Sequence, residues 1–192
     1  MRQSKALLPF GDEAMLARVV RLLGGAVPTE SIVVVAARAQ PLPALPAEVA
    51  IVYDETPDQG PLPALAAGLA ALPAGVEIAF ATACDAPLLR AAFVRRLFEL
   101  LEAGGEVAVV APDDGERLHP LAAAYHVGCA EQLQNVMAVG ERSLHRALTG
   151  GQMRMRRVGV DELRLADPEL ASLVNCNTEE DCVAALAAAG FG

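Results

Sequence analysis

The sequence predicts an α/β protein with a mainly parallel central sheet flanked by helices. Two observations support this fold class. Short, β-branched apolar runs alternate with segments of helical periodicity along the chain. Several of these runs are apolar at nearly every position, which is typical of strands buried on both faces of a parallel sheet. No repeat or interior linker divides the 192 residues, so we expect one domain over residues 1–192.

The N-terminal half contains three expected strands and two expected helices. Apolar residues at helical spacing predict a helix over residues 12–24, with Asp12 as its N-cap and Gly24 or Gly25 at its end. A second helix is expected over residues 62–72. The strands are expected in the runs SIVVVAAR (31–38), VAIVYD (49–54) and VEIAFATAC (76–84).

The C-terminal half repeats this alternation. Strands are expected in EVAVVAP (106–112), LHPLAAAYH (118–126) and MRMRRVGV (153–160). Helices are expected over residues 90–103, 128–139, 143–149 and 177–190. In the last of these, Thr178 is placed as N-cap and Asp181 as its N3 partner, close to a capping box. Ser143 is expected to cap the helix over residues 143–149.

Composition limits the class of function. The formal net charge of −9 argues against non-specific binding of nucleic acid, but not against nucleotides held by a few local groups. The sequence contains no apolar run long enough for a transmembrane helix and no signal-peptide pattern. The four cysteines show no zinc-ligand spacing. We therefore expect a reduced, cytoplasmic protein.

Two carboxylates stand at the expected carboxyl ends of strands, where α/β proteins bind ligands. Asp54 follows VAIVY, and Asp85 follows IAFATAC. A carboxylate at the position of Asp85 can hold a Mg²⁺ ion that also contacts phosphates. A helix cap or an ordinary loop carboxylate explains Asp85 equally well, and spacing alone does not choose between them.

Other candidates carry weaker signals. Lys5 is the only lysine, and an ammonium group can reach a phosphate, although a plain surface lysine is the simpler interpretation. Gly60 opens the turn before an expected helix and could bring backbone N–H groups to a ligand. Asn175 and Asn177 flank Cys176, so in an extended segment both amides would face one ligand. Capping of the last helix would explain only one of them.

Seven motifs occur together in one order, with a helix after the first: KALLPFG, VVVAARAQ, D-x-x-P-x-x-GPL, ATACDAPLL, LHPLAAAYH, ERSL and NCNTEED. In this order the chain resembles the bacterial molybdenum cofactor guanylyltransferases over nearly its whole length. The resemblance implies a Rossmann-like nucleotidyltransferase fold. It also implies transfer of GMP from Mg-GTP to molybdopterin, with pyrophosphate released.

The resemblance also implies roles for single residues. Lys5 would contact the GTP phosphates and Asp85 would bind Mg²⁺, which makes these two the catalytic candidates. Asp54 and the Gly60 segment would help to hold the guanosine. Asn175 and Asn177 would lie on the molybdopterin side. Partners would be GTP, molybdopterin and, beyond them, molybdoenzymes or cofactor-delivery proteins, with no nucleic acid or membrane involved.

The chain departs from the family pattern in three places. The family begins with a strand and a glycine-rich loop, of the form LAGGxSxRMGxxK, and the part before its methionine is missing here. Ala37 stands where many members carry Asn, and Ala64 replaces a glycine in GPLxGL. Two alternatives therefore stay open. One is a related nucleotidyltransferase that uses CTP or a sugar phosphate, and the other is a non-catalytic cofactor-binding protein.

Overall fold

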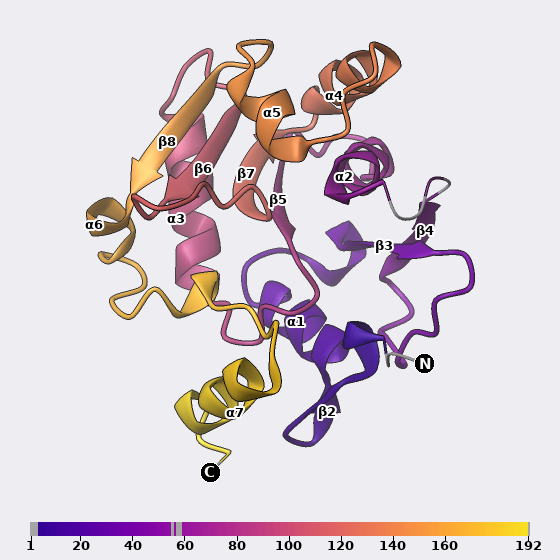
Figure 1. Ribbon diagram of the computed structural model, residues 1–192, viewed down its shortest axis with the longest axis vertical. Helices are drawn as coiled ribbons and strands as arrows, with labels where there is room; N and C mark the ends of the chain where they lie inside the picture. The colour runs from indigo at the N-terminus through magenta and orange to yellow at the C-terminus, as the bar shows by residue number, and fades with distance from the viewer. Residues whose placement is uncertain (1–3, 55, 57–58, 192) are drawn as a thin grey trace.

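The largest sheet in the computed structural model, which describes residues 4–54, 56 and 59–191, has four strands. They are β5 (Ile78–Thr82), β7 (Ala122–His126), β6 (Val109–Asp113) and β8 (Met155–Gly159), hydrogen-bonded in that order (Figure 1). Three of them lie within runs that the sequence predicts as strands, and β6 extends one residue beyond its predicted run, 106–112. The α/β fold class is therefore confirmed.

The strand directions correct one expectation. Among the described pairs of this sheet, β7 is antiparallel to both β5 and β6, and β6 is parallel to β8. The sheet is therefore mixed, and the expectation of a mainly parallel central sheet is wrong. The reason lies in the connection after β6. Residues 114–121 contain no helix, and a link this short joins antiparallel neighbours, whereas a parallel crossover needs about a dozen residues or more.

Two smaller sheets lie nearer the N-terminus. Strands β3 (Val33–Ala37) and β4 (Ala50–Asp54) form a parallel pair, joined by a long proline-rich connection. Strands β1 (Pro9–Phe10) and β2 (Glu13–Ala14) form a tight hairpin. The described strands thus form three separate sheets, where the sequence predicts a single central one.

Each predicted helix has a counterpart among the described helices, whereas α6 and the short 3₁₀ helices were not predicted. The α-helices are α1 (Met15–Leu23), α2 (Pro61–Ala70), α3 (Ala91–Glu102), α4 (Cys129–Ala138), α5 (Leu144–Thr149), α6 (Val160–Leu163) and α7 (Glu179–Ala188). Short 3₁₀ helices are η1 (Lys5–Leu7), η2 (Thr29–Ser31) and η3 (Ala171–Leu173). Ser143 caps α5 as expected, since its hydroxyl accepts a hydrogen bond from the Arg146 N–H.

The start of α1 differs from its prediction. The helix begins at Met15, not near residue 12, and its N-cap position is Ala14, which forms no side-chain cap. Asp12 lies in the hairpin turn, where Gly11 has a φ of 62°. Pairing of β1 with β2 keeps residues 13 and 14 extended, so the helix cannot start earlier. Gly24 ends the helix as predicted.

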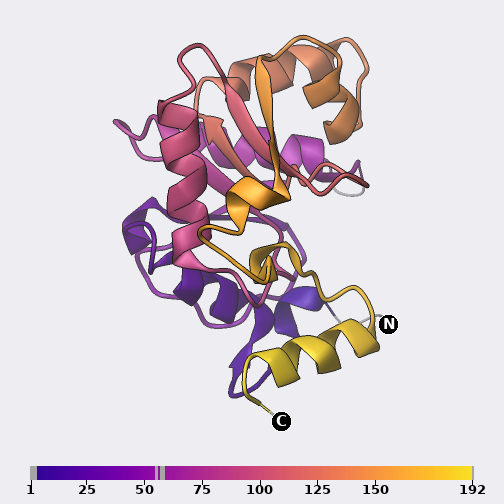
Figure 2. The same cartoon turned by 90° about the vertical axis from the view of Figure 1, so that its left-hand side faces the viewer.

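Helices cover both faces of the four-stranded sheet. Phe93 of α3 packs on one face with Val110 and Ala124, and Figure 2 shows α3 running along the sheet. On the other face, Leu62 of α2 packs with Tyr125, together with residues of α4 and α5. Adjacent residues of β7 enter opposite clusters because side chains alternate along a strand.

None of the described helices is long and apolar enough to span a membrane. The single domain expected over residues 1–192 stays a prediction.

Candidate active site

Three side chains that are far apart in the sequence meet beyond the carboxyl end of β5. The Lys5 ammonium donates to Asp85 Oδ2 at 2.6 Å and to Asn177 Oδ1 at 2.9 Å. Asp85 lies in the turn after β5, and Lys5 lies in η1. Only 10% of the Asp85 side chain is exposed, against 43% for Lys5. The structure therefore brings together both predicted catalytic residues and one predicted amide, and we call this set the Lys5 cluster.

Backbone contacts hold the Asn177 segment against Asp85. The N–H of Cys176 donates to the backbone oxygen of Asp85 at 2.8 Å, and the Cys176 side chain is buried. Burial raises the pKa of the Cys176 thiol to about 12, so it stays protonated at neutral pH. The buried, neutral side chain of Cys176 thus anchors the segment that carries Asn177.

The capping box of α7 fixes the other flank of Asn177. The Thr178 hydroxyl accepts from the Asp181 N–H at 3.1 Å, and Asp181 Oδ2 accepts from the N–H groups of Thr178 and Asn177 at 2.8 Å and 3.0 Å. Hydrogen bonds from these backbone groups, Thr178 first, lower the pKa of the Asp181 carboxyl. The predicted capping box is confirmed, and it also orients the backbone of Asn177.

The two predicted asparagines, Asn175 and Asn177, have different positions relative to the Lys5 cluster. Asn177 joins the Lys5 cluster through its side chain. Asn175 is half-buried, and its backbone oxygen accepts from the Asn177 N–H at 3.2 Å. That bond bends the segment, which is not the extended backbone on which the prediction of two amides facing one ligand rested.

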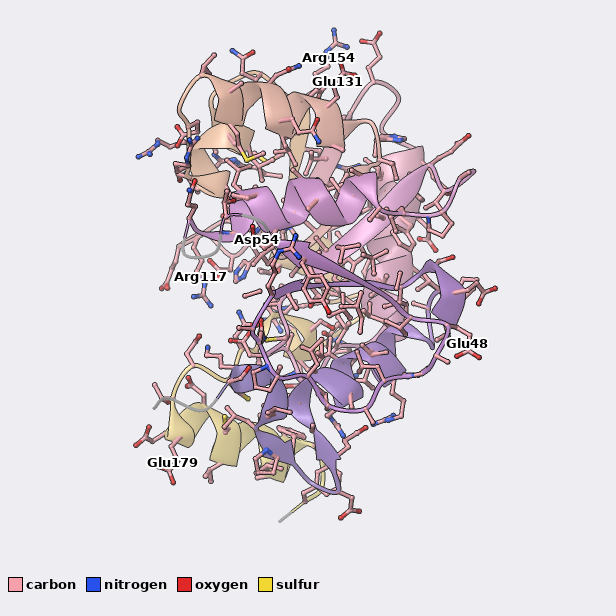
Figure 3. The ribbon with its side chains drawn as sticks, turned by 90° about the vertical axis from the view of Figure 1, so that its right-hand side faces the viewer. Glu48, Asp54, Arg117, Glu131, Arg154 and Glu179 are labelled. Atoms are coloured by element: carbon pink, nitrogen blue, oxygen red, sulfur yellow. The ribbon has the colours of Figure 1, made fainter. Side chains whose placement is uncertain are left out.

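Asp54 and Gly60 lie in a different loop from the Lys5 cluster. Asp54 ends β4, and its Oδ1 accepts from the Thr56 N–H at 2.8 Å and from the Thr56 hydroxyl at 3.2 Å. Gly60 precedes α2 with a φ of 79°, which favours glycine. Figure 3 shows Asp54 and Arg117 on the same side of the molecule. Pro57 of the D-x-x-P-x-x-GPL motif lies outside the described residues, as do Glu55 and Asp58.

His119 has a structural partner. Its Nε2 lies 2.7 Å from Asp114 Oδ2. The Arg117 backbone N–H, and after it the His119 side chain, hold the pKa of the Asp114 carboxyl well below its usual range. These contacts fix the turn between β6 and β7, which accounts for the buried histidine without a catalytic role.

One connection beside the Lys5 cluster was not predicted from the sequence. The Gln40 side chain donates to the Ser4 hydroxyl at 3.3 Å and accepts from the Ala37 N–H at 3.2 Å. It therefore ties the carboxyl end of β3 to the segment that carries Lys5. A polar glutamine three residues after the end of an apolar strand is the signal for it in the sequence.

The side chains of the site indicate whether a metal ion could bind there. Among the described residues, no group of three or more His, Cys, Asp or Glu side chains could hold a metal by itself. Mg²⁺ is commonly held by one or two carboxylates together with substrate phosphates and water. Asp85, a mostly buried carboxylate that already attracts a cationic group, fits that kind of site.

Comparison with known proteins identifies the family. A family model described as "MobA-like NTP transferase domain" matches residues 1–157. A protein of Mycobacterium avium named "Probable molybdenum cofactor guanylyltransferase" is 40% identical over 185 residues, which cover 94% of this chain and 86% of that protein. This chain belongs to the MobA-like NTP transferase family. It is therefore a nucleotidyltransferase by family, and the resemblance found in the sequence is confirmed.

Further proteins similar to this chain point to the same family and fold. A protein of Mycobacterium tuberculosis with the same printed name is 36% identical over 175 residues, covering 90% of this chain and 84% of that protein. The crystal structure of molybdopterin-guanine dinucleotide biosynthesis protein A from Archaeoglobus fulgidus matches with a TM-score of 0.76 at 18% identity, covering 98% and 91% of the two chains. A 2-C-methyl-D-erythritol 4-phosphate cytidylyltransferase from Thermus thermophilus matches with a TM-score of 0.70 at 14% identity, covering 97% and 93%. The two structures show a shared nucleotidyltransferase fold.

Proposed function

We propose that the protein transfers GMP from GTP to molybdopterin of the molybdenum cofactor, forming molybdopterin guanine dinucleotide and pyrophosphate. The names of the mycobacterial relatives support this choice of substrates. The Lys5 cluster carries the proposal, because a cation, a carboxylate and an amide converge where α/β sheets bind their ligands.

The reaction is a displacement at phosphorus. An oxygen of the molybdopterin phosphate attacks the α-phosphorus of GTP and forms a new P–O bond. The bond from the α-phosphorus to the oxygen that bridges the β-phosphate breaks, and its electron pair leaves with pyrophosphate. In such transfers the protein mainly aligns the two phosphates and neutralises their charge.

The residues of the Lys5 cluster suit this task. Lys5 presents a compact, partly exposed ammonium group to the triphosphate. Asp85 would hold Mg²⁺, which would supply further neutralisation of phosphate charge. Asn177 positions the Lys5 ammonium through its side-chain oxygen. On binding, the phosphates replace the Asp85 carboxylate as the partner of Lys5.

Further roles belong to the same proposal. Asp54 and the Gly60 segment would contact the guanosine, while Asn175 and Asn177 would lie on the molybdopterin side. Gly60 has no side chain and a φ of 79°, so it would let the backbone before α2 approach a ligand closely. Molybdoenzymes or cofactor-delivery proteins would be the downstream partners, and the cytoplasm the expected location.

Product formation tests the proposal. The full chain is incubated with Mg²⁺, molybdenum cofactor and either GTP or CTP, and both pyrophosphate and the mass of the dinucleotide are measured. We expect pyrophosphate and the guanine dinucleotide only when GTP and the cofactor are both present. A cytosine dinucleotide would instead establish a related cytidylyltransferase. Cofactor binding without pyrophosphate from either nucleotide would establish a non-catalytic binding protein.

A further inference from the structure

Arg18 of α1 is a nearly buried cation that is not a member of the Lys5 cluster. Only 11% of its side chain is exposed. Burying a guanidinium group costs free energy unless its donors and its charge find partners. Arg21, three residues further along the same helix, also pairs with Glu13, yet 57% of its side chain is exposed. The ion pair with Glu13 therefore does not require burial, and the other partners of Arg18 must account for it.

One of these partners is the loop that carries Asp85. Arg18 Nε donates to the backbone oxygen of Pro87 at 2.7 Å. Pro87 comes two residues after Asp85, in the turn that follows β5. Hydrogen bonds from a charged donor are among the strong ones in proteins, and the ring of a proline fixes its own φ angle. A bond so near to Asp85 along the chain restricts where its carboxylate can lie.

Arg18 also contacts the β1–β2 hairpin, which follows Lys5 and η1 in the chain. Its Nη1 donates to Glu13 Oε1 of β2 at 3.2 Å. Its guanidinium carbon lies 4.6 Å from the centre of the Phe10 ring of β1, and Phe10 is fully buried. A cation over an aromatic face is attracted to it, more strongly where water is excluded. Arg18 thus holds the hairpin that begins four residues after Lys5.

A third contact reaches the segment after α7, the helix that follows Asn177. The guanidinium carbon of Arg18 lies 5.4 Å from the centre of the Phe191 ring. The rings of Phe191 and Phe10 pack edge to face, with centres 6.0 Å apart. Gly11 permits this approach, because a Cβ there would lie 2.6 Å from Cζ of Phe191. Helix α7, which lies beside the hairpin in Figure 2, is therefore held at both ends, by its capping box and by these rings.

Arg18 therefore connects the three segments of chain that carry the Lys5 cluster. We propose that it is a positioning residue, which sets the places of Lys5, Asp85 and Asn177 relative to one another without contacting the substrate. The role requires a guanidinium group, since its donors diverge toward two segments while its plane lies against aromatic rings, and an ammonium group does not do both. The proposal rests on the proposed function and adds to it a residue outside the site.

The test compares Arg18→Gln with its matched control, Arg21→Gln. Both changes remove one charge from α1 and one ion pair with Glu13, but only the first removes the contacts with Pro87 and the rings. Because Lys5 is the only lysine, protein labelled with ¹³C-lysine gives one set of side-chain NMR signals, which report the surroundings of Lys5. These signals need neither GTP nor turnover, so they test the positioning role even if the proposed function fails. The thermal midpoint, kcat and KM for GTP are measured on the same variants.

We expect Arg18→Gln to shift the Lys5 signals toward those of a free lysine and to lower kcat about 10-fold with a smaller change in KM, because small displacements of catalytic groups slow a reaction. Arg21→Gln should leave the Lys5 signals and kcat unchanged. Native Lys5 signals in Arg18→Gln would overturn the proposal, and so would shifted signals with an unchanged kcat. Shifted signals in a protein whose native form transfers no GMP would support the positioning role and reject the proposed function.

Two further variants separate positioning from general stability. Val110→Ala removes two methyl groups from a fully buried residue of β6, so it should lower the thermal midpoint and leave the Lys5 signals in place. An equal shift of the signals in Val110→Ala and Arg18→Gln would overturn the proposal. Phe191→Ala, at a partly exposed ring, removes one contact of Arg18 and tests the role even if Arg18→Gln does not fold. It should move the Lys5 signals in the same direction by less, and unchanged signals would overturn the proposal.

Discussion

Strand β5 borders two regions that differ in what fills them. Beyond its carboxyl end, Asp85 is bound by Lys5 and by the backbone of Cys176, so polar groups there have partners. Along its other edge lies a cavity of about 660 Å³ with mostly apolar walls, bordered on its opposite side by β3 and occupied by no strand among the described residues; we call this cavity the slot. The comparison teaches that activity and stability should depend on different sides of one strand. Changes in the Lys5 cluster should affect turnover, and changes beside the slot should affect unfolding.

The largest expected effect is that of Asp85→Asn on turnover. The change keeps the size of the side chain and removes the charge that would hold Mg²⁺, so we expect kcat/KM to fall about 10³-fold. Pyrophosphate release measures it, and the thermal midpoint should change little. The matched control is Asp161→Asn, at an exposed residue of α6. Full activity of Asp85→Asn would refute the metal assignment.

The second-largest effect is expected for Lys5→Gln. It should lower kcat/KM about 10²-fold, because a neutral amide cannot offset phosphate charge. The control is Arg154→Gln, which Figure 3 shows at the far end of the molecule from α7. Arg154 pairs only with exposed Glu106 among the contacts that the structure describes. An equal loss in both variants would show that overall charge, and not the Lys5 position, governs turnover.

A pair of valines sharpens the stability side of the comparison. Val110 of β6 is fully buried, and Val35 of β3 borders the slot and is half-buried. We expect Val110→Ala to lower the free energy of unfolding by about 2 kcal/mol and Val35→Ala by less than about 1 kcal/mol. The second change only enlarges an existing cavity. Urea unfolding measures both, and equal losses would mean that the slot is packed in solution.

The smallest expected effect is the pH dependence of stability that Glu141 contributes. Glu141 serves as a reference because it belongs neither to the Lys5 cluster nor to the slot. Arg146 first, and then the Ser143 backbone N–H, lower the pKa of the Glu141 carboxyl to about 2 from 4.5. A lowered pKa in the folded state stabilises the protein above pH 4.5, and this stabilisation is lost as the pH falls toward 2. The thermal midpoint of the native chain should therefore exceed that of Glu141→Gln at pH 7, and the two should converge near pH 2. Glu131→Gln on α4 should show no such convergence.

Local sequence signals predicted much of this structure. The positions of β3 to β8 and of the longer helices follow from apolar periodicity, which depends on neighbouring residues, whereas the hairpin of β1 and β2 was not predicted. The capping box at Thr178 was equally predictable, since its partners are three residues apart. Lys5 and Asp85 could be named because a single lysine and an aspartate after an apolar strand are both visible in the sequence, even though 80 positions separate them.

Long-range pairing was harder to predict. The antiparallel direction of β7 depends on the short link after β6, and its apolar run alone does not encode it. The bond between Gln40 and Ser4 joins two loops that no local pattern connects. The different places of Asn175 and Asn177 depend on a bend in the backbone, whereas the prediction assumed an extended one. The separation of the β3–β4 pair from the four-stranded sheet likewise depends on which strands form hydrogen bonds with each other.

The most direct measurement is a crystal structure of the full chain with GTP and Mg²⁺, without the molybdopterin acceptor, so that no transfer occurs. The account predicts that the triphosphate lies beyond the carboxyl end of β5, within hydrogen-bonding distance of Lys5 Nζ, with a metal ion on Asp85. A triphosphate bound away from both side chains, or a nucleotide inside the slot, would contradict it.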